Sequence, residues 1–139
     1  MPAPIQALLQ SLWFPVLARI LLTFCFWGSG LAKLIDFQGG TAEMAVFGFS
    51  PPALVNAVVI ATQLGGSLLI ISGRHVWLGT GMLAVFTGLT ILLVHHFWTM
   101  EGEAAIAHFH TATEHVTVIG AMMVMAVLST RPRPGRPFA

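Results

Sequence analysis

Four long apolar stretches constrain the fold of this chain more than any other feature. They cover about residues 13–34, 53–72, 76–98 and 109–129, and each is close to the roughly 20 residues with which a helix crosses a bilayer. None shows the period-two alternation of a membrane β-barrel strand. The sequence therefore predicts an all-α protein, a four-transmembrane-helix bundle forming a single membrane domain over residues 1–130, with a flexible cytoplasmic tail over residues 131–139.

Charged residues are too few to cover a surface that faces water. They make up 8% of the chain, whereas hydrophobic residues make up 56%, and a soluble domain carries about 25% charged residues. The lipid bilayer is therefore the expected main partner. The net charge of +1 comes without a clustered basic face, which excludes nucleic acid as a partner. The first residues carry no positive charge, so a removable signal peptide is not expected.

The connecting segments predict the orientation of the bundle. Positive residues lie in the short second connection and in the tail, namely Arg74, Arg131, Arg133 and Arg136. Carboxylates lie in the first and third connections, namely Asp36, Glu43, Glu101 and Glu103. Cytoplasmic loops of membrane proteins carry an excess of Lys and Arg. Both termini are thus expected to be cytoplasmic, in a multi-pass protein of a bacterial inner membrane, with the third connection facing the periplasm.

Titratable side chains are concentrated between residues 94 and 115, which hold five of the six histidines. His110 and Glu114 are four residues apart and share one face of a helix. The adjacent His95 and His96 diverge by about 100° on a helix, so one of them is expected to complete a site. Two imidazoles and a carboxylate suit zinc, iron or copper. The predicted metal ligands are His95, His96, His110, Glu114 and His115.

Three other interpretations of this histidine-rich window remain open. Histidines from opposed helices ligate haem in membrane bundles. Without a metal, an imidazole beside a carboxylate can relay protons next to a quinone head group, because histidine titrates near neutral pH. In a purely structural interpretation, the histidines anchor helix ends at the interface, and His108 and His110 are solvated loop residues.

Two polar residues inside the apolar stretches extend the predicted cofactor site. Arg19 would bind an anionic group or a quinone carbonyl, or else reach the headgroups or a partner inside the bundle. Gln63 shares a helix face with Asn56 and Ser67, and it would contact a substrate or join helices by hydrogen bonds. The predicted cofactor-binding residues are Arg19, Gln63, His95 and His115.

Several short motifs resemble those of one family of membrane proteins. They are Arg-Ile-Leu at 19–21, Trp-Gly-Ser-Gly-Leu-Ala-Lys-Leu at 27–34, Gly-Phe-Ser-Pro at 48–51, Leu-Gly-Gly at 64–66 and His-His-Phe-Trp at 95–98. Over about residues 19–120 the chain resembles the DoxX family. The resemblance implies a four-helix inner-membrane protein. Some relatives are linked to quinone-coupled sulfur oxidation, and others to membrane oxidoreductase complexes that handle oxidative stress.

The chain departs from the family pattern at two places. It has Gln63 where relatives often carry Glu, and Glu114-His115 where relatives often carry Lys-Asn. A Glu/Lys pairing inside the bundle therefore does not carry over. A carboxylate and an imidazole in the fourth helix replace it, which favours a changed site.

The sequence thus predicts a DoxX-like integral membrane subunit of redox chemistry, either quinone-linked or metal-binding, at the periplasmic face. The chain would be an oxidoreductase subunit, and the sequence does not assign catalysis to the chain alone, because it has no nucleotide-binding fold, no haem-attachment motif and no nucleophile with a base. The alternative is an accessory or assembly subunit that packs against a larger membrane complex or against a copy of itself. Its glycine-rich helix faces would then form the surface that binds the partner.

Overall fold

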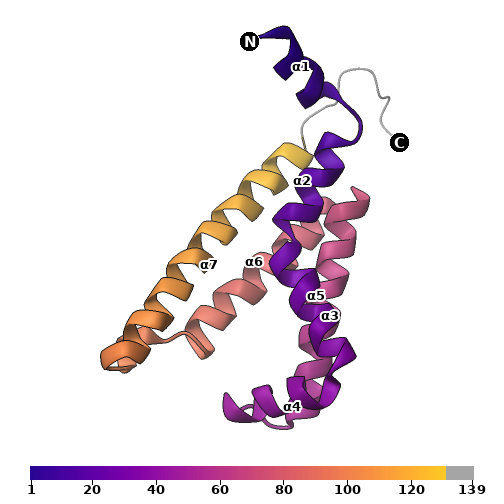
Figure 1. Cartoon of the computed structure of the whole chain (residues 1–139). Helices are drawn as coiled ribbons and strands as arrows, with labels where there is room; N and C mark the ends of the chain where they lie inside the picture. Colours follow the sequence, from indigo (N-terminus) through magenta and orange to yellow (C-terminus); the bar gives the residue numbers. More distant parts are fainter. Residues whose placement is uncertain (131–139) are drawn as a thin grey trace. The chain divides into compact units, whose positions relative to one another are not determined.

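The computed structural model describes residues 1–130, which form helices without a single strand (Figure 1). The expected all-helical fold is confirmed. The chain divides into two compact units, and the division falls between His75 and Val76. The first unit contains α1 (Ala3–Gln10), α2 (Phe14–Leu22), α3 (Phe24–Ile35), α4 (Phe37–Val46) and α5 (Pro52–Ser72). The second contains α6 (Val76–Leu93), the 3-10 turn η1 (Phe97–Thr99) and α7 (Gly102–Ser129).

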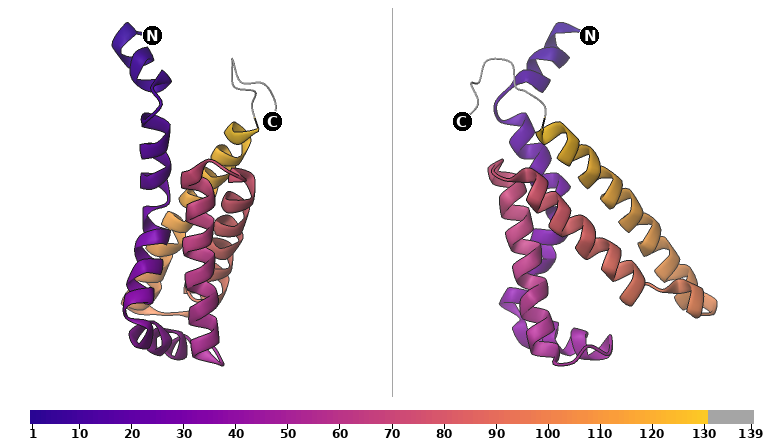
Figure 2. Two further views of the ribbon diagram at one scale, coloured as in Figure 1. Left: turned by 90° about the vertical axis from the view of Figure 1, so that its right-hand side faces the viewer. Right: turned by 180° about the vertical axis from the view of Figure 1, so that it is seen from behind.

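A single residue, Thr23, interrupts the first predicted span. Thr23 separates α2 from α3, yet hydrogen bonds continue across it, from Thr23 N to Arg19 O and from Trp27 N to Thr23 O. The Ile20 carbonyl accepts a hydrogen bond from the Trp27 indole Nε1 at 3.0 Å. These hydrogen bonds join the two helices across the break. As a result, α2 and α3 follow nearly the same direction (Figure 2).

Helix α5 forms the centre of the first unit. It begins after Pro51, where proline can open a helix, and it ends at Gly73, which has the left-handed φ of 72°. Figure 2 shows α3 alongside α5, with α4 turned across their end. A Cβ at Gly30 of α3 would come within 2.9 Å of the Leu64 side chain. The close approach of α3 and α5 therefore depends on the missing side chain.

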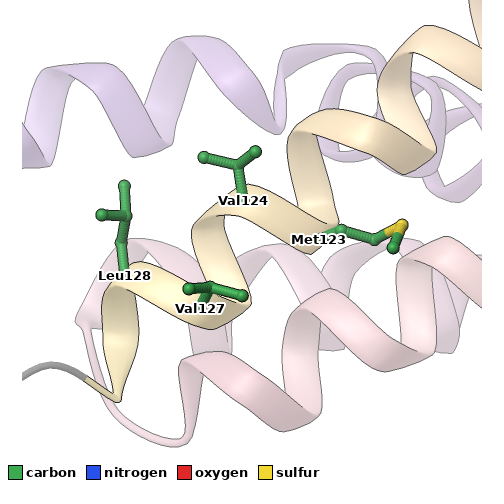
Figure 3. A pocket seen from close by; sticks show the side chains of 4 residues that line it. All are labelled: Met123, Val124, Val127 and Leu128. Carbon is green, nitrogen blue, oxygen red and sulfur yellow. The ribbon is translucent and has the colours of Figure 1, made fainter.

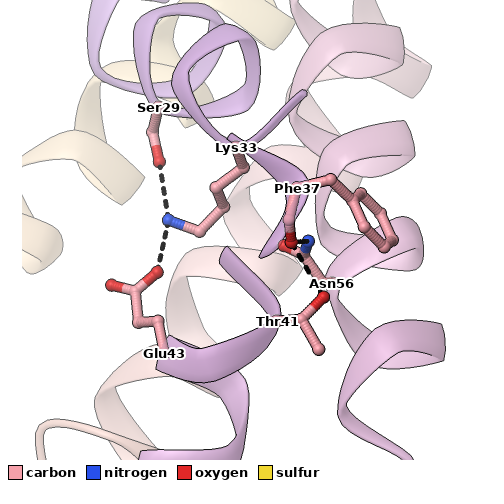
Figure 4. Close-up of polar contacts among 6 residues, drawn as sticks. All are labelled: Ser29, Lys33, Phe37, Thr41, Glu43 and Asn56. Carbon is pink, nitrogen blue, oxygen red and sulfur yellow. Dashed lines mark hydrogen bonds and ion pairs between the residues drawn. The ribbon is translucent and has the colours of Figure 1, made fainter. Parts of the chain in front are cut away.

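Polar contacts hold α4 against its neighbours (Figure 4). The Asp36 carboxylate accepts a hydrogen bond from Gly39 N at 2.9 Å and caps the helix. Asn56 of α5 donates from Nδ2 to the Phe37 carbonyl at 3.2 Å. Lys33 Nζ lies 2.6 Å from the Glu43 carboxylate and 3.4 Å from Ser29 Oγ. An ion pair thus links α3 to α4.

The second unit is a helical hairpin in which α6 and α7 pack side by side. The predicted helix over residues 76–98 ends earlier, at Leu93, and residues 97–99 form η1 instead. The fourth helix, predicted from residue 109, begins at Gly102, where a φ of 62° turns the chain into it. His108 and His110 are therefore helical, and the interpretation of them as loop residues was wrong.

Three helical segments are long and apolar enough to cross a membrane: Pro52–Ser72, Val76–Thr99 and Gly102–Ser129. A fourth is reached if α1 and α2, which bend by 69° at their junction, count as one span. The chain is thus a helical membrane protein whose exposed apolar side chains face lipid. Exactly four spans and cytoplasmic termini remain predictions. The predicted flexible tail, residues 131–139, lies outside the described residues.

Candidate functional site

Three histidines meet at the end of the hairpin where the chain passes from α6 to α7. His95 Nδ1 lies 3.2 Å from His108 Nδ1, which is hydrogen-bonding distance. The rings of His95 and His115 meet edge to face with their centroids 5.0 Å apart. All three side chains are half-buried. We call His95, His108 and His115 the histidine cluster.

The end of α6 directs His95 into this cluster. Val94 N and His95 N both donate to the Thr90 carbonyl at 2.9 Å, which closes the helix. Phe97 N then donates to the His95 carbonyl at 2.8 Å and starts η1. The Phe97 ring packs edge to face on Phe109 of α7, with centroids 5.2 Å apart. This aromatic contact ties η1 to α7.

The other predicted metal ligands have different surroundings. His96 turns away from the cluster, and its Nδ1 lies 2.7 Å from Thr99 Oγ1. His110 and Glu114 are exposed on α7. Within residues 1–130, no group of three or more His, Cys, Asp or Glu side chains is arranged to hold a metal ion. The expected set of two imidazoles and a carboxylate is therefore not assembled there.

Sequence reasoning did not place His108 in the site. The spacing of His110 and Glu114 drew attention to one face of α7, whereas His108 and His115, seven residues apart, share another face. Ala112 and Met122 are buried on this second face. The positions of the small and apolar residues around His108 and His115 were the available signal, because they mark the face that packs on α6.

The bond between His95 and His108 has a defined proton arrangement. A hydrogen bond between two Nδ1 atoms needs one ring that carries the proton there and one that accepts it. The pair therefore shares one Nδ1 proton between two imidazoles. The ring that donates from Nδ1 keeps a free lone pair at Nε2, so the pair can take up a second proton there while the bond between the two Nδ1 atoms stays in place.

The two remaining cofactor candidates belong to the first unit. The Arg19 guanidinium lies against the end of α5, where a Cβ at Gly73 would be 2.5 Å from its Nη1. Cations stabilise helix C-termini. This placement agrees with the interpretation in which Arg19 meets a partner inside the bundle. Gln63 is buried, with 6% of its surface exposed. Its Oε1 has no hydrogen-bond partner among the described residues, and neither does Ser67 Oγ one turn later.

One pocket of the second unit is lined by apolar side chains. Four side chains on the last turns of α7 line a shallow space of about 270 Å³: Met123, Val124, Val127 and Leu128 (Figure 3). No donor or acceptor among these side chains could orient a polar substrate. Such a surface suits an acyl chain or an apolar helix better than a reacting molecule.

Comparison with known proteins identifies the family of this chain. The DoxX family model matches residues 14–96, more than half of the chain, and reaches from α2 to His95 and His96. The inner membrane protein YphA of Escherichia coli (strain K12) is 25% identical over 112 residues, which cover 81% of this chain and 80% of that protein. No solved structure matches the chain. The apolar helices and this relative place the chain in the inner membrane as a multi-pass protein. The chain belongs to the DoxX family.

Proposed function

We propose that the protein is an inner-membrane subunit of a quinone-linked redox system, in which the histidine cluster accepts and returns protons at the periplasmic end of α6 and α7. The observation that carries this proposal is the 3.2 Å contact between His95 Nδ1 and His108 Nδ1. Two imidazoles that share one proton form a group that can take up another and pass it on.

The surroundings of the cluster fit an amphipathic ring compound. Exposed apolar and aromatic side chains lie beside it in sequence, among them Trp98, Ile106 and Phe109. Imidazole nitrogens offer both a donor and an acceptor, which are the groups that a quinone carbonyl or a quinol hydroxyl needs. Ligand sites of this kind combine an apolar lining with a few placed polar groups. A bound quinone would supply a two-electron couple whose oxidation and reduction release and take up protons.

The chain's own residues would then bind and move protons but not electrons. His95, donating its Nδ1 proton to His108, would accept a proton from a quinol hydroxyl at its free Nε2 and could then pass its Nδ1 proton across the hydrogen bond to His108 Nδ1. His115, edge to face with His95, would hold the ring orientation. The electrons would pass to an acceptor held by a partner subunit, so the proposed role is that of a redox subunit and not of a complete enzyme.

Quinone titration of the purified full chain in lipid nanodiscs tests the proposal. Ubiquinone-1 should quench tryptophan fluorescence with saturation, because Trp98 packs on Phe97, the residue of η1 that contacts α7 at the cluster's end of the hairpin. His95→Gln and His108→Gln should each raise the dissociation constant about tenfold, which corresponds to the loss of about 1.4 kcal/mol. His110→Gln is the matched control, since His110 is exposed on the same helix and should leave binding unchanged. Equal constants for all four proteins would refute the proposal.

Two further measurements decide between this function and its competitors. The first is metal analysis with an optical spectrum of the same preparation. A stoichiometric metal or haem that is lost in His95→Gln would favour the metal or haem interpretation, and the proposal expects neither. Gln63→Met belongs in the same titration, because the unpartnered Gln63 Oε1 is the other candidate to meet a polar ligand. A loss of binding there, with the histidine variants unaffected, would move the site to the first unit.

The accessory-subunit alternative is favoured by the apolar pocket on α7. If that surface receives a partner helix, Val124→Trp should abolish co-purification with a larger membrane assembly while quinone binding persists. Glu114→Gln, an exposed change on the same helix, should leave both properties intact. Co-purification that survives Val124→Trp would count against this role for the pocket.

A further inference from the structure

Helix α1 has one apolar and one polar face. Ile5, Leu8 and Leu9 recur at the spacing of a single helix face, and Gln6 and Gln10 lie four residues apart on another. The three apolar side chains are exposed in the structure. The helix is only eight residues long, about 12 Å, so it cannot cross a bilayer alone.

The chain turns sharply between α1 and α2. The two helix axes differ by 69°, and Ser11 is placed at the junction. Its Oγ donates to the Leu8 carbonyl at 2.7 Å and accepts a hydrogen bond from Phe14 N at 3.4 Å. Ser11 therefore ends α1 and starts α2 with the same hydroxyl, and the bend has a local cause.

The helices that follow α1 are long enough to span the membrane without it. Residues 14–35, which form α2 and α3, measure about 33 Å at 1.5 Å per residue, against a hydrocarbon core of about 30 Å. Hydrogen bonds across Thr23 keep the two helices joined. If α2 and α3 make one span, α1 lies beyond its end, at the level of the membrane surface.

Two observations indicate that lipid covers the apolar face of α1. Trp13 is exposed at the bend, and indole rings gather at the membrane–water interface. The first residues of α2 after Trp13 also carry exposed apolar side chains, including Val16 and Leu17, so exposed apolar side chains lie on both sides of the bend. We propose that α1 lies in the plane of the interface, with Ile5, Leu8 and Leu9 toward the acyl chains and Gln6 and Gln10 toward the headgroups.

The absence of charged residues in α1 indicates which lipid headgroups it needs. Amphipathic helices that select anionic lipids carry Lys or Arg on their polar face, whereas α1 carries only glutamines there. Its attachment therefore comes from buried apolar area and needs no anionic lipid. An uncharged helix held in this way would set the depth and tilt of the span formed by α2 and α3.

Fluorescence depth measurements on the full chain test this placement. In a Cys25→Ser background, which removes the chain's one cysteine, an environment-sensitive label is attached at Leu9→Cys or at Gln6→Cys. The proteins are reconstituted in phosphatidylcholine vesicles. Bromines placed just below the headgroups should quench the Leu9 label at least about threefold more than the Gln6 label, and iodide in water should show the reverse order. Adding anionic lipid should change neither result.

Two outcomes would overturn the proposal. If bromines near the bilayer centre quenched either α1 label best, α1 and α2 would form one broken span. If both labels responded only to iodide, α1 would lie in water. A variant with Ile5→Gln and Leu9→Gln, labelled at Leu8→Cys, should gain iodide quenching, whereas Gln6→Ala with Gln10→Ala should not. Unchanged thermal unfolding of these variants confirms that the label reports on α1 alone.

Discussion

Among single residues, Asn56 and Gln63 are two buried amides of α5 that differ in their hydrogen bonds. Asn56 is fully buried; its Nδ2 donates to the carbonyl of Phe37, the first residue of α4, whereas its Oδ1 has no partner among the described residues. Gln63 is buried two turns later with an unpartnered Oε1. A buried polar group stabilises a fold only when it is hydrogen-bonded. Asn56 therefore fits a structural role through its Nδ2 bond, although its unpartnered Oδ1 has the same kind of cost as Gln63 Oε1, which a ligand could relieve.

Substitution of these two amides should change stability in different directions. Asn56→Ala removes the bond to Phe37 and leaves a cavity, so it should lower the free energy of unfolding by about 1–3 kcal/mol. Gln63→Met replaces an unpartnered amide by an apolar chain of similar length, so it should be neutral or stabilising. Thermal unfolding in detergent measures both. A loss from Gln63→Met as large as that from Asn56→Ala would contradict this assignment.

Gly73 is the residue at which backbone conformation matters most for the first unit. Its φ of 72° is strained for other residues, and a Cβ there would meet the Arg19 guanidinium. Gly73→Ala should therefore destabilise the protein by about 1–3 kcal/mol. Gly65→Ala is the control, because a Cβ at Gly65 meets nothing within 4 Å, and it should be neutral or slightly stabilising. Similar unfolding temperatures for the two variants would exclude strain at Gly73.

Among the helices, α4 depends most on specific polar contacts. Its Asp36 cap is local, whereas the Lys33–Glu43 pair joins it to α3. The Lys33 side chain is 17% exposed and the Glu43 side chain 45% exposed, so solvent screens part of the attraction. The pair is best understood as a contact that fixes the angle between α3 and α4 and adds little to overall stability.

A double-mutant cycle measures this contact. Lys33→Met and Glu43→Gln should show a coupling of about 0.5–1 kcal/mol, as partly exposed pairs do, and the coupling should shrink at high salt. Lys33→Met combined with Asp36→Asn is the matched control and should be additive, because the Asp36 carboxylate accepts from Gly39 N and does not pair with Lys33. Zero coupling between Lys33 and Glu43 would show that the contact has no energetic role.

At the scale of the whole molecule, the predicted orientation of the spans can be tested from outside the cell. Arg74 lies between α5 and α6, and Glu101 lies between η1 and α7. In a Cys25→Ser background, a membrane-impermeant maleimide should label Glu101→Cys in spheroplasts, but Arg74→Cys only after permeabilisation. Phe47→Cys, between α4 and α5, should behave like Glu101→Cys. The reverse pattern would place the histidine cluster in the cytoplasm and remove the periplasmic part of the proposed function.

Much of the molecule could be predicted because membrane helices are specified locally. An apolar run of sufficient length must satisfy its backbone hydrogen bonds within itself, so α5, α6 and α7 could be anticipated from residues 53–129. The motifs at 27–34 and 95–98 indicated the DoxX family, which the family match confirms. The break at Thr23 and the start of α7 at Gly102 were not anticipated, because each depends on individual hydrogen bonds and φ values.

The sequence by itself determined that this chain is helical, lies in a membrane and concentrates its histidines near one helical connection. Only the tertiary structure decided which of them meet. Side-chain partners depend on where α6 ends and how α7 is rotated against it, and these follow from packing such as that of Phe97 on Phe109. Because each residue turns a helix by about 100°, His110 lies about 200° around α7 from His108, and for this reason His108 joined His95 while His110 remained exposed.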